Sequence, residues 1–226
     1  MLASVGRVRE GAAMLDEVVR TDQPTPGLLY QHVVALWAAG RPFEADRAMA
    51  DVWRRFPRHF AVWYSRFYLL SYTGRSAEAL AMADDVDSWP SGSSPEQMDW
   101  IVRFARAARS RAPEEIDAVI ALGLEWARRG TGYAENAIQF ASALGRPDPA
   151  FAIADAYYFD RGFRVPDMRF VTGQGTHMRL QDRRTMILFL PPTALLRRDP
   201  RFVRLTEALG LERYWRDSGT RPDYRA

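Results

Sequence analysis

The chain has 226 residues, of which 47% are hydrophobic, so it is long enough to bury a substantial core. It contains no Cys, which excludes disulfides, thiolate metal sites and cysteine nucleophiles. Arg7, Arg9 and Glu10 interrupt the N-terminal stretch, so we expect no signal peptide. No apolar run approaches the roughly 20 residues that span a bilayer. These features predict a cytoplasmic protein that does not bind a membrane.

All 31 basic residues are Arg, as expected of a GC-rich bacterial genome, and the formal net charge is only +3. The charge is unevenly distributed, because residues 161–204 contain ten Arg and three Asp while the rest contains 21 Arg and 25 acidic residues. The small net charge makes nucleic-acid binding unlikely as a main function. Direct nucleic-acid binding through the basic segment is retained as a minor alternative.

A six-residue pattern recurs along the chain, reading GRVREG, GRPFEA, GRSAEA, RAPEEI and GRPDPA. Its first positions are Gly6, Gly40 and Gly74, spaced by 34 residues, and then Arg111 and Gly145, again spaced by 34. A Gly can close a helix in the left-handed conformation, and Pro or Ser suits the start of the next helix. The small residue at the sixth position then allows close packing on the preceding helix. The pattern predicts a repeated helix–turn–helix unit.

The repeat and the apolar periodicity predict nine helices. They cover residues 6–20, 26–39, 42–56, 59–73, 76–87, 95–110, 113–129, 131–144 and 147–161. After residue 161 the pattern stops, and we expect an irregular segment with short extended pieces. A helix should then begin at Asp199-Pro200 and run to Leu209, followed by a last short helix in LERYWRDSG.

The repeat resembles the tetratricopeptide repeat (TPR) family in its period, its inter-helix Gly, its small residue and its terminal Pro. The residues that carry this resemblance are Gly40, Ala45, Pro57, Gly74, Ala79 and Pro90. Leu29, His32 and Val33 depart from it, because they stand where the family has Trp, Leu and Gly. The resemblance implies an all-α, TPR-like solenoid of about four to five repeats over residues 1–161. Residues 162–226 would be an Arg-rich irregular segment and a helical cap that packs on the solenoid.

The string LRRDPRFVRLTEALGLERYWRDSG resembles the closing segment of bacterial TPR arrays, including arrays attached to winged-helix regulators or nucleotide-cyclase domains. The residues that carry the resemblance are Arg198, Asp199, Pro200, Arg201, Phe202, Leu209, Gly210 and Leu211. This resemblance implies a non-catalytic cap over the last repeat.

The candidate catalytic and metal-binding patterns are weak. His32, His59 and His177 lie in different repeats without ligand spacing, and the DDVD sequence at 84–87 lacks the central Gly of a calcium loop. The TGQGT sequence at 172–176 lacks the strand, Lys and helix of a phosphate-binding loop. We therefore predict a protein that is not an enzyme and has no metal site and no cofactor.

The resemblance also implies a concave groove that is lined by the first helix of each repeat and binds a protein or peptide. Transferred to this chain, the groove positions are Tyr30, Val34, Trp37, Tyr64, Tyr68, Tyr72, Ile101, Arg109, Glu135 and Gln139. Exposed Tyr and Trp side chains are typical of binding hot spots, although these aromatics could equally pack against neighbouring helices.

Two functions follow from these observations. The first is a non-enzymatic scaffold that binds a peptide or protein segment in the groove. The alternative is the C-terminal sensory or regulatory domain of a larger bacterial regulator, such as a transcription factor or a cyclase. We also expect residues 162–198 to fold back on the repeats, because MILFLPP would otherwise expose apolar side chains.

Overall fold

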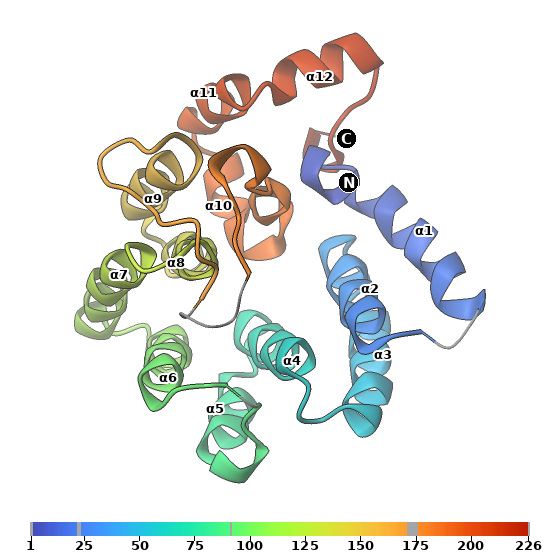
Figure 1. Cartoon of the computed structure of the whole chain (residues 1–226), viewed down its shortest axis with the longest axis vertical. Helices are drawn as coiled ribbons and strands as arrows, with labels where there is room; N and C mark the ends of the chain where they lie inside the picture. Colours follow the sequence, from blue (N-terminus) through green and yellow to red (C-terminus); the bar gives the residue numbers. More distant parts are fainter. Residues whose placement is uncertain (1, 22–23, 91, 171–175, 226) are drawn as a thin grey trace. The chain divides into compact units, whose positions relative to one another are not determined.

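The computed structural model describes residues 2–21, 24–90, 92–170 and 176–225. These residues form an all-α protein (Figure 1), and the only β pairing among them is an isolated bridge between Met168 and His177. The chain divides into two compact units. Unit 1 comprises Met1–Ala3 and Arg7–Ser110, and unit 2 comprises Ser4–Gly6 and Arg111–Ala226.

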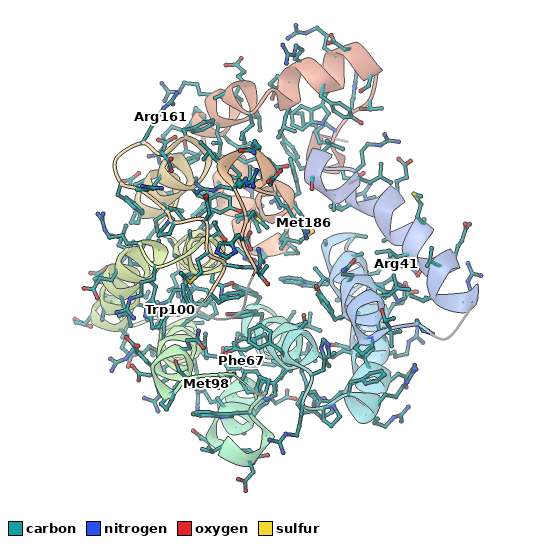
Figure 2. The ribbon with its side chains drawn as sticks, viewed as in Figure 1. Arg41, Phe67, Met98, Trp100, Arg161 and Met186 are labelled. Carbon is teal, nitrogen blue, oxygen red and sulfur yellow. The ribbon has the colours of Figure 1, made fainter. Side chains whose placement is uncertain are left out.

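Unit 1 is built from consecutive helices that pack on one another. Its helices are α1 (Val8–Thr21), α2 (Pro26–Ala38), α3 (Pro42–Arg55), α4 (Phe60–Tyr72), α5 (Ser76–Asp84), the 3-10 turn η2 (Val86–Ser88) and α6 (Pro95–Ser110). The 3-10 turn η1 (Leu2–Val5) precedes them, with Leu2 and Ala3 in unit 1 and Ser4 and Val5 in unit 2. Each of α2 to α6 packs on the helix before it, and α2 also contacts α4. Phe67 on α4 and Met98 and Trp100 on α6, labelled in Figure 2, are almost completely buried.

Unit 2 is centred on α8, which Figure 1 shows among α7, α9 and α10. Its helices are α7 (Pro113–Ala127), α8 (Thr131–Ala143), α9 (Pro147–Phe159), η3 (Leu180–Asp182), η4 (Met186–Phe189), η5 (Pro191–Thr193), α10 (Ala194–Arg197), α11 (Arg201–Ala208), α12 (Leu211–Ser218) and η6 (Asp223–Arg225). Nearly every residue of α8 is buried, which is why its sequence shows little amphipathic pattern.

The nine predicted repeat helices are confirmed, each to within three residues at either end. The predicted helix from Asp199 starts later, as α11 at Arg201, and its N-cap is Pro200; the Asp199 carboxylate accepts the Arg201 backbone N–H at 2.9 Å. Of the short extended pieces expected after residue 161, the bridge between Met168 and His177 is one, but the stretch 180–197 forms 3-10 turns and the short helix α10 instead. Its apolar side chains are buried as anticipated, with Leu188 fully covered. The predicted domain boundary at residues 161/162 stays a prediction.

The first residue of each repeat hexamer adopts the left-handed conformation. The φ angles are +78° at Gly6, +78° at Gly40, +80° at Gly74, +57° at Arg111 and +78° at Gly145. The predicted role of Gly40 and Gly74 as helix-closing residues is therefore confirmed. Arg111 shows that the turn geometry is kept even where the sequence lacks Gly, at the cost of backbone strain that a side chain adds in this conformation.

The segment Ser4–Gly6 belongs to unit 2 because residues near the C-terminus bind its backbone. The Trp215 indole N–H donates to the Val5 carbonyl at 2.8 Å, and the Asp223 N–H donates to the Gly6 carbonyl at 2.9 Å. A Cβ on Gly6 would lie only 2.7 Å from the Pro222 Cβ, so the segment is packed closely as well as hydrogen-bonded.

Charged side chains join α1 to α2 and α3 in unit 1. The Asp16 carboxylate lies 2.6 Å from His32 Nε2 and accepts a 2.6 Å hydrogen bond from Arg41, which also pairs with Glu44 (Arg41 is labelled in Figure 2). Burial acts to raise the pKa of Asp16, but the hydrogen bonds from Arg41 and His32 outweigh it and lower the pKa.

The turn geometry makes testable predictions for Gly74 and Arg111. We expect Gly74→Ala to lower the free energy of unfolding by about 1–2 kcal/mol, from backbone strain alone, because no atom lies within 4 Å of the added Cβ. Both Arg111→Gly and Arg111→Ala lose the hydrogen bond from the Arg111 side chain to the Ala143 carbonyl at 3.2 Å, but only Arg111→Gly removes the strain, so it should be the more stable of the two by about 1 kcal/mol. Urea denaturation at an unchanged m-value measures all three variants. Arg111→Gly no more stable than Arg111→Ala would contradict the assigned strain.

The Asp16 pairing predicts a pH-dependent contribution to stability. Because the folded pKa is lowered, the contribution is present above the unfolded pKa of about 3.9 and is lost as the pH falls through the folded value. We expect Asp16→Asn to be less stable than wild type at pH 7, with a difference that shrinks below about pH 4. Asp51→Asn, at an exposed pair with Arg54, is the control and should differ little at any pH. A pH-independent difference for Asp16→Asn would exclude the electrostatic cause.

Candidate functional site

Four aromatic side chains form a row along α4, which we call the aromatic row: Phe60, Tyr64, Tyr68 and Tyr72. Their spacing of four residues places them on one face of the helix. Successive ring centroids lie 4.6, 6.1 and 6.0 Å apart. All four side chains are partly exposed, whereas the opposite face of α4, with Val62, is buried. The row therefore offers a continuous aromatic surface in unit 1.

The C-terminal end of the aromatic row is held by neighbouring helices. Trp37 of α2 stacks on Tyr72 with a centroid distance of 5.7 Å, and Phe104 of α6 packs against Tyr72 at 5.3 Å. Burial raises the pKa of the Tyr72 phenol well above its ordinary value. Of the three predicted Tyr positions on α4, Tyr72 is thus the one most committed to packing.

The middle of the row combines ring surface with polar groups. The Tyr64 hydroxyl lies 3.3 Å from the Ser93 Oγ and donates to the Met98 sulfur at 3.6 Å. These contacts fix the ring orientation of Tyr64 while part of the side chain stays exposed. Tyr68, between Tyr64 and Tyr72, is likewise partly exposed.

The other predicted positions in unit 1 differ in exposure. Tyr30 and Val34 are partly exposed on α2, in the helix that also supplies Trp37. Ile101 is only 2% exposed and Arg109 is exposed, so the α6 positions do not form one surface of the kind seen on α4. The structure thus brings Trp37 and the three Tyr of α4 together.

The two remaining predicted positions, Glu135 and Gln139, are buried on α8 of unit 2. Gln139 donates to the Glu135 backbone carbonyl at 3.1 Å. The Glu135 carboxylate accepts a hydrogen bond from the Tyr157 hydroxyl at 2.8 Å and pairs with Arg169 at 2.7 Å. Burial, then the charge of Glu135, raises the pKa of the Tyr157 phenol, so this hydroxyl stays protonated and donates.

Arg169 belongs to a hairpin-like segment that we call the tongue, residues 165–170 and 176–178. Its two arms are joined by hydrogen bonds from Arg169 N–H to the Thr176 carbonyl at 2.9 Å and from Met178 N–H to the Asp167 carbonyl at 2.7 Å. The predicted TGQGT turn falls largely on residues 171–175, outside the described part of the chain.

The tongue lies against the N-terminus of α8. The Thr131 N–H donates to the Met168 carbonyl at 2.8 Å, and the Gly132 N–H donates to the Arg169 carbonyl at 2.7 Å. These are two of the amides that a helix cannot satisfy within its own first turn. A Cβ on Gly132 would lie 2.4 Å from the Phe170 ring, so Gly is required for this close approach.

The base of the tongue is fixed by Arg183, whose side chain is 1% exposed. Its guanidinium donates to the carbonyls of Tyr157 and Val165, and it lies 3.5 Å from Asp160 and 3.4 Å from Asp167. These contacts of Arg183, which we call the clamp, act on the first residues of the tongue and on the end of α9, and they share Tyr157 with the Arg169–Glu135 pair.

Several of the arginines in residues 161–204 make hydrogen bonds within unit 2. Besides Arg169 and Arg183, Arg197 donates to the carbonyls of Leu188 and Leu190, and burial lowers the pKa of Arg197 to about 10. A charge surplus in the sequence is therefore a poor guide to the exposed charge here. Nucleic-acid binding by this segment remains an untested alternative.

Sequence reasoning missed three members of the unit 2 network: Tyr157, Arg169 and Arg183. Tyr157 lies in α9 within an apolar run, and the two arginines are among ten in the basic segment, so no local pattern distinguishes them. The one available signal was Gly132, because a Gly in the first turn of a predicted helix indicates close approach of another group.

The structure gives no support to the weaker patterns. His59 is exposed before α4 and His177 is exposed in the tongue, while the acidic residues of 84–87 are exposed at the end of α5. Within the described ranges, no cluster of three His, Asp or Glu side chains could hold a metal ion. None of the helices described is long and apolar enough to cross a membrane.

Searches against protein-family models, curated proteins and solved structures found no match.

The Arg183 clamp predicts a large effect of a single substitution. Arg183→Met should lower the free energy of unfolding by about 2–4 kcal/mol, because it leaves the carbonyls of the buried residues Tyr157 and Val165 without their donor. The matched control is the exposed neighbour Arg184→Met, which should change stability by no more than about 0.5 kcal/mol. Thermal and urea unfolding measure both variants. Equal stability of the two would rule out the clamp.

Proposed function

We propose that the chain is a non-enzymatic interaction module with TPR-like helical repeats, and that unit 1 binds an extended segment of a partner protein on the aromatic row. The observation that carries this proposal is the continuous, partly exposed line of Phe60, Tyr64, Tyr68 and Tyr72. Aromatic side chains supply large contact area at low entropic cost, which is why they dominate binding hot spots.

The repeat interpretation is supported by regularities that extend beyond helix content. The left-handed residue recurs at the same position in all five hexamers, including the one that lacks Gly. The sixth position is buried in four of them, with Ala45, Ala79 and Ala150 at 0% exposure and Ile116 at 4%. A repeated turn with a repeated buried contact is the construction expected of stacked hairpins.

The dimensions of the row suit a short linear ligand. Tyr72 lies twelve positions after Phe60 on the helix, a rise of about 18 Å. An extended peptide advances about 3.3 Å per residue, so five to six residues would cover the row. Aliphatic and Arg side chains are the best matches, because both stack on Tyr faces and Arg adds a cation–π attraction. Unit 1 already contains one such contact, with Arg66 4.6 Å from the centre of the Trp53 ring.

A selection from random heptapeptides displayed on phage tests the proposal with the immobilised full chain. We expect enrichment of peptides that combine aliphatic and Arg residues. Tyr64→Ala and Tyr68→Ala should each weaken their binding at least tenfold, which corresponds to about 1.4 kcal/mol. Fluorescence polarisation of the enriched peptides measures the dissociation constants.

The matched control is Tyr214→Ala, since this Tyr is 37% exposed on α12 of unit 2. It should leave the affinity unchanged. Melting temperatures of the three variants separate lost binding from lost folding. Peptides that bind both row variants as tightly as wild type, or the absence of any enriched peptide, would refute a binding role for the row.

A further inference from the structure

We propose that the N-terminal half of α8 in unit 2 is a peptide-recognition site for an Arg–aromatic pair, and that the tongue is its built-in occupant. The observation is that Met168, Arg169 and Phe170 sit on α8 through main-chain, charged and aromatic contacts together. The inference deepens the proposed function, on which it rests, by assigning a second site with a defined ligand chemistry.

The main-chain contacts would hold a bent segment in register. Thr131 and Gly132 present consecutive N–H groups, and the carbonyls of Met168 and Arg169 accept them at 2.8 and 2.7 Å. Successive carbonyls of an extended strand point to opposite sides, so two consecutive carbonyls that face one helix end require a bend in the bound backbone, and they carry no sequence information. These bonds therefore set the position of the ligand, and the side chains set its identity.

Specificity for Arg comes from Glu135. Both terminal nitrogens of Arg169 donate to this carboxylate, at 3.1 Å to Oε1 and 2.7 Å to Oε2, while Tyr157 donates to Oε1 as well. The Glu135 side chain is only 9% exposed, so a ligand without a cation would leave a buried charge underpaired. A Lys would offer one point of contact instead of the two-pronged geometry that this carboxylate receives.

Specificity for an aromatic residue comes from the surface over Gly132. The Phe170 ring packs edge-on against Tyr133 with a centroid distance of 5.4 Å, over the space that a Cβ on Gly132 would fill. Arg169 also lies over the Phe170 ring, 5.3 Å from its centroid, so the Arg and the aromatic residue support each other. The pair is recognised as one element.

The tongue can leave this site without releasing its base. Arg183 holds the carbonyls of Val165 and Tyr157 through hydrogen bonds that involve neither Arg169 nor Phe170. A tethered occupant competes at a high effective concentration, on the order of millimolar for a short connection. A peptide in solution should therefore bind weakly to the wild-type chain and much more tightly once the tongue lacks its own Arg–aromatic pair.

The test uses the full chain with Arg169→Ala and Phe170→Ala together, and a fluorescein-labelled peptide of residues 164–179. By fluorescence polarisation, we expect the double variant to bind this peptide at least tenfold more tightly than wild type. The same peptide with both positions changed to Ala is the ligand control and should bind neither protein. No binding to a folded double variant would show that the tongue is a fixed part of the fold.

Glu135→Gln in the double variant is the matched site control, and it should weaken peptide binding at least tenfold while the far-UV circular dichroism is retained. If the double variant does not fold, Phe170→Ala alone serves in its place, because it keeps the Arg169–Glu135 pair. Dependence on Glu135 identifies the α8 site, and dependence on Tyr64 and Tyr68 identifies the aromatic row. The two sets of variants therefore distinguish a failure of the α8 site from a failure of the aromatic row.

Discussion

The constraint on which the helical repeat depends is a backbone one: one residue per repeat must adopt positive φ where a helix ends. Gly40 and Gly74 do so without a side chain, and nothing packs against the position of their missing Cβ. Their role is therefore purely conformational. The reversal places the second helix back on the first, and the small side chains of Ala45 and Ala79 then let the paired helices approach closely.

Local physics explains why most of the fold could be predicted. Helix starts at Pro42, Pro113 and Pro147, and the left-handed residues at helix ends, are encoded within a few positions of one another. The stretch 162–198 has no comparable local sequence signals for its turns. Its conformation follows from partners distant in sequence, such as the Thr131 amide for the Met168 carbonyl, so apolar content could predict its burial but not its turns.

The two candidate sites differ in the same way, because local sequence predicts the aromatic row but not the contacts of Glu135. The spacing of Tyr64, Tyr68 and Tyr72 by four residues is visible in the sequence, and the row follows from helix geometry alone. Glu135 lies on the helix predicted from the sequence, α8, but its burial and its pairing depend on Tyr157 and Arg169. The ion pair between Glu135 and Arg169 joins residues 34 positions apart, and a single sequence contains no pattern that predicts it.

The binding of Ser4–Gly6 by unit 2 affects the order in which the protein can fold during its synthesis. The Val5 carbonyl is bound by Trp215, which is synthesised 210 residues later, and the Gly6 carbonyl is bound by Asp223. The helices of unit 1 contact near neighbours in sequence and can form while translation continues. Unit 2 can be completed only once α12 and Asp223 have been synthesised, so a nascent or truncated product lacking α12 would leave the Val5 carbonyl without its indole donor.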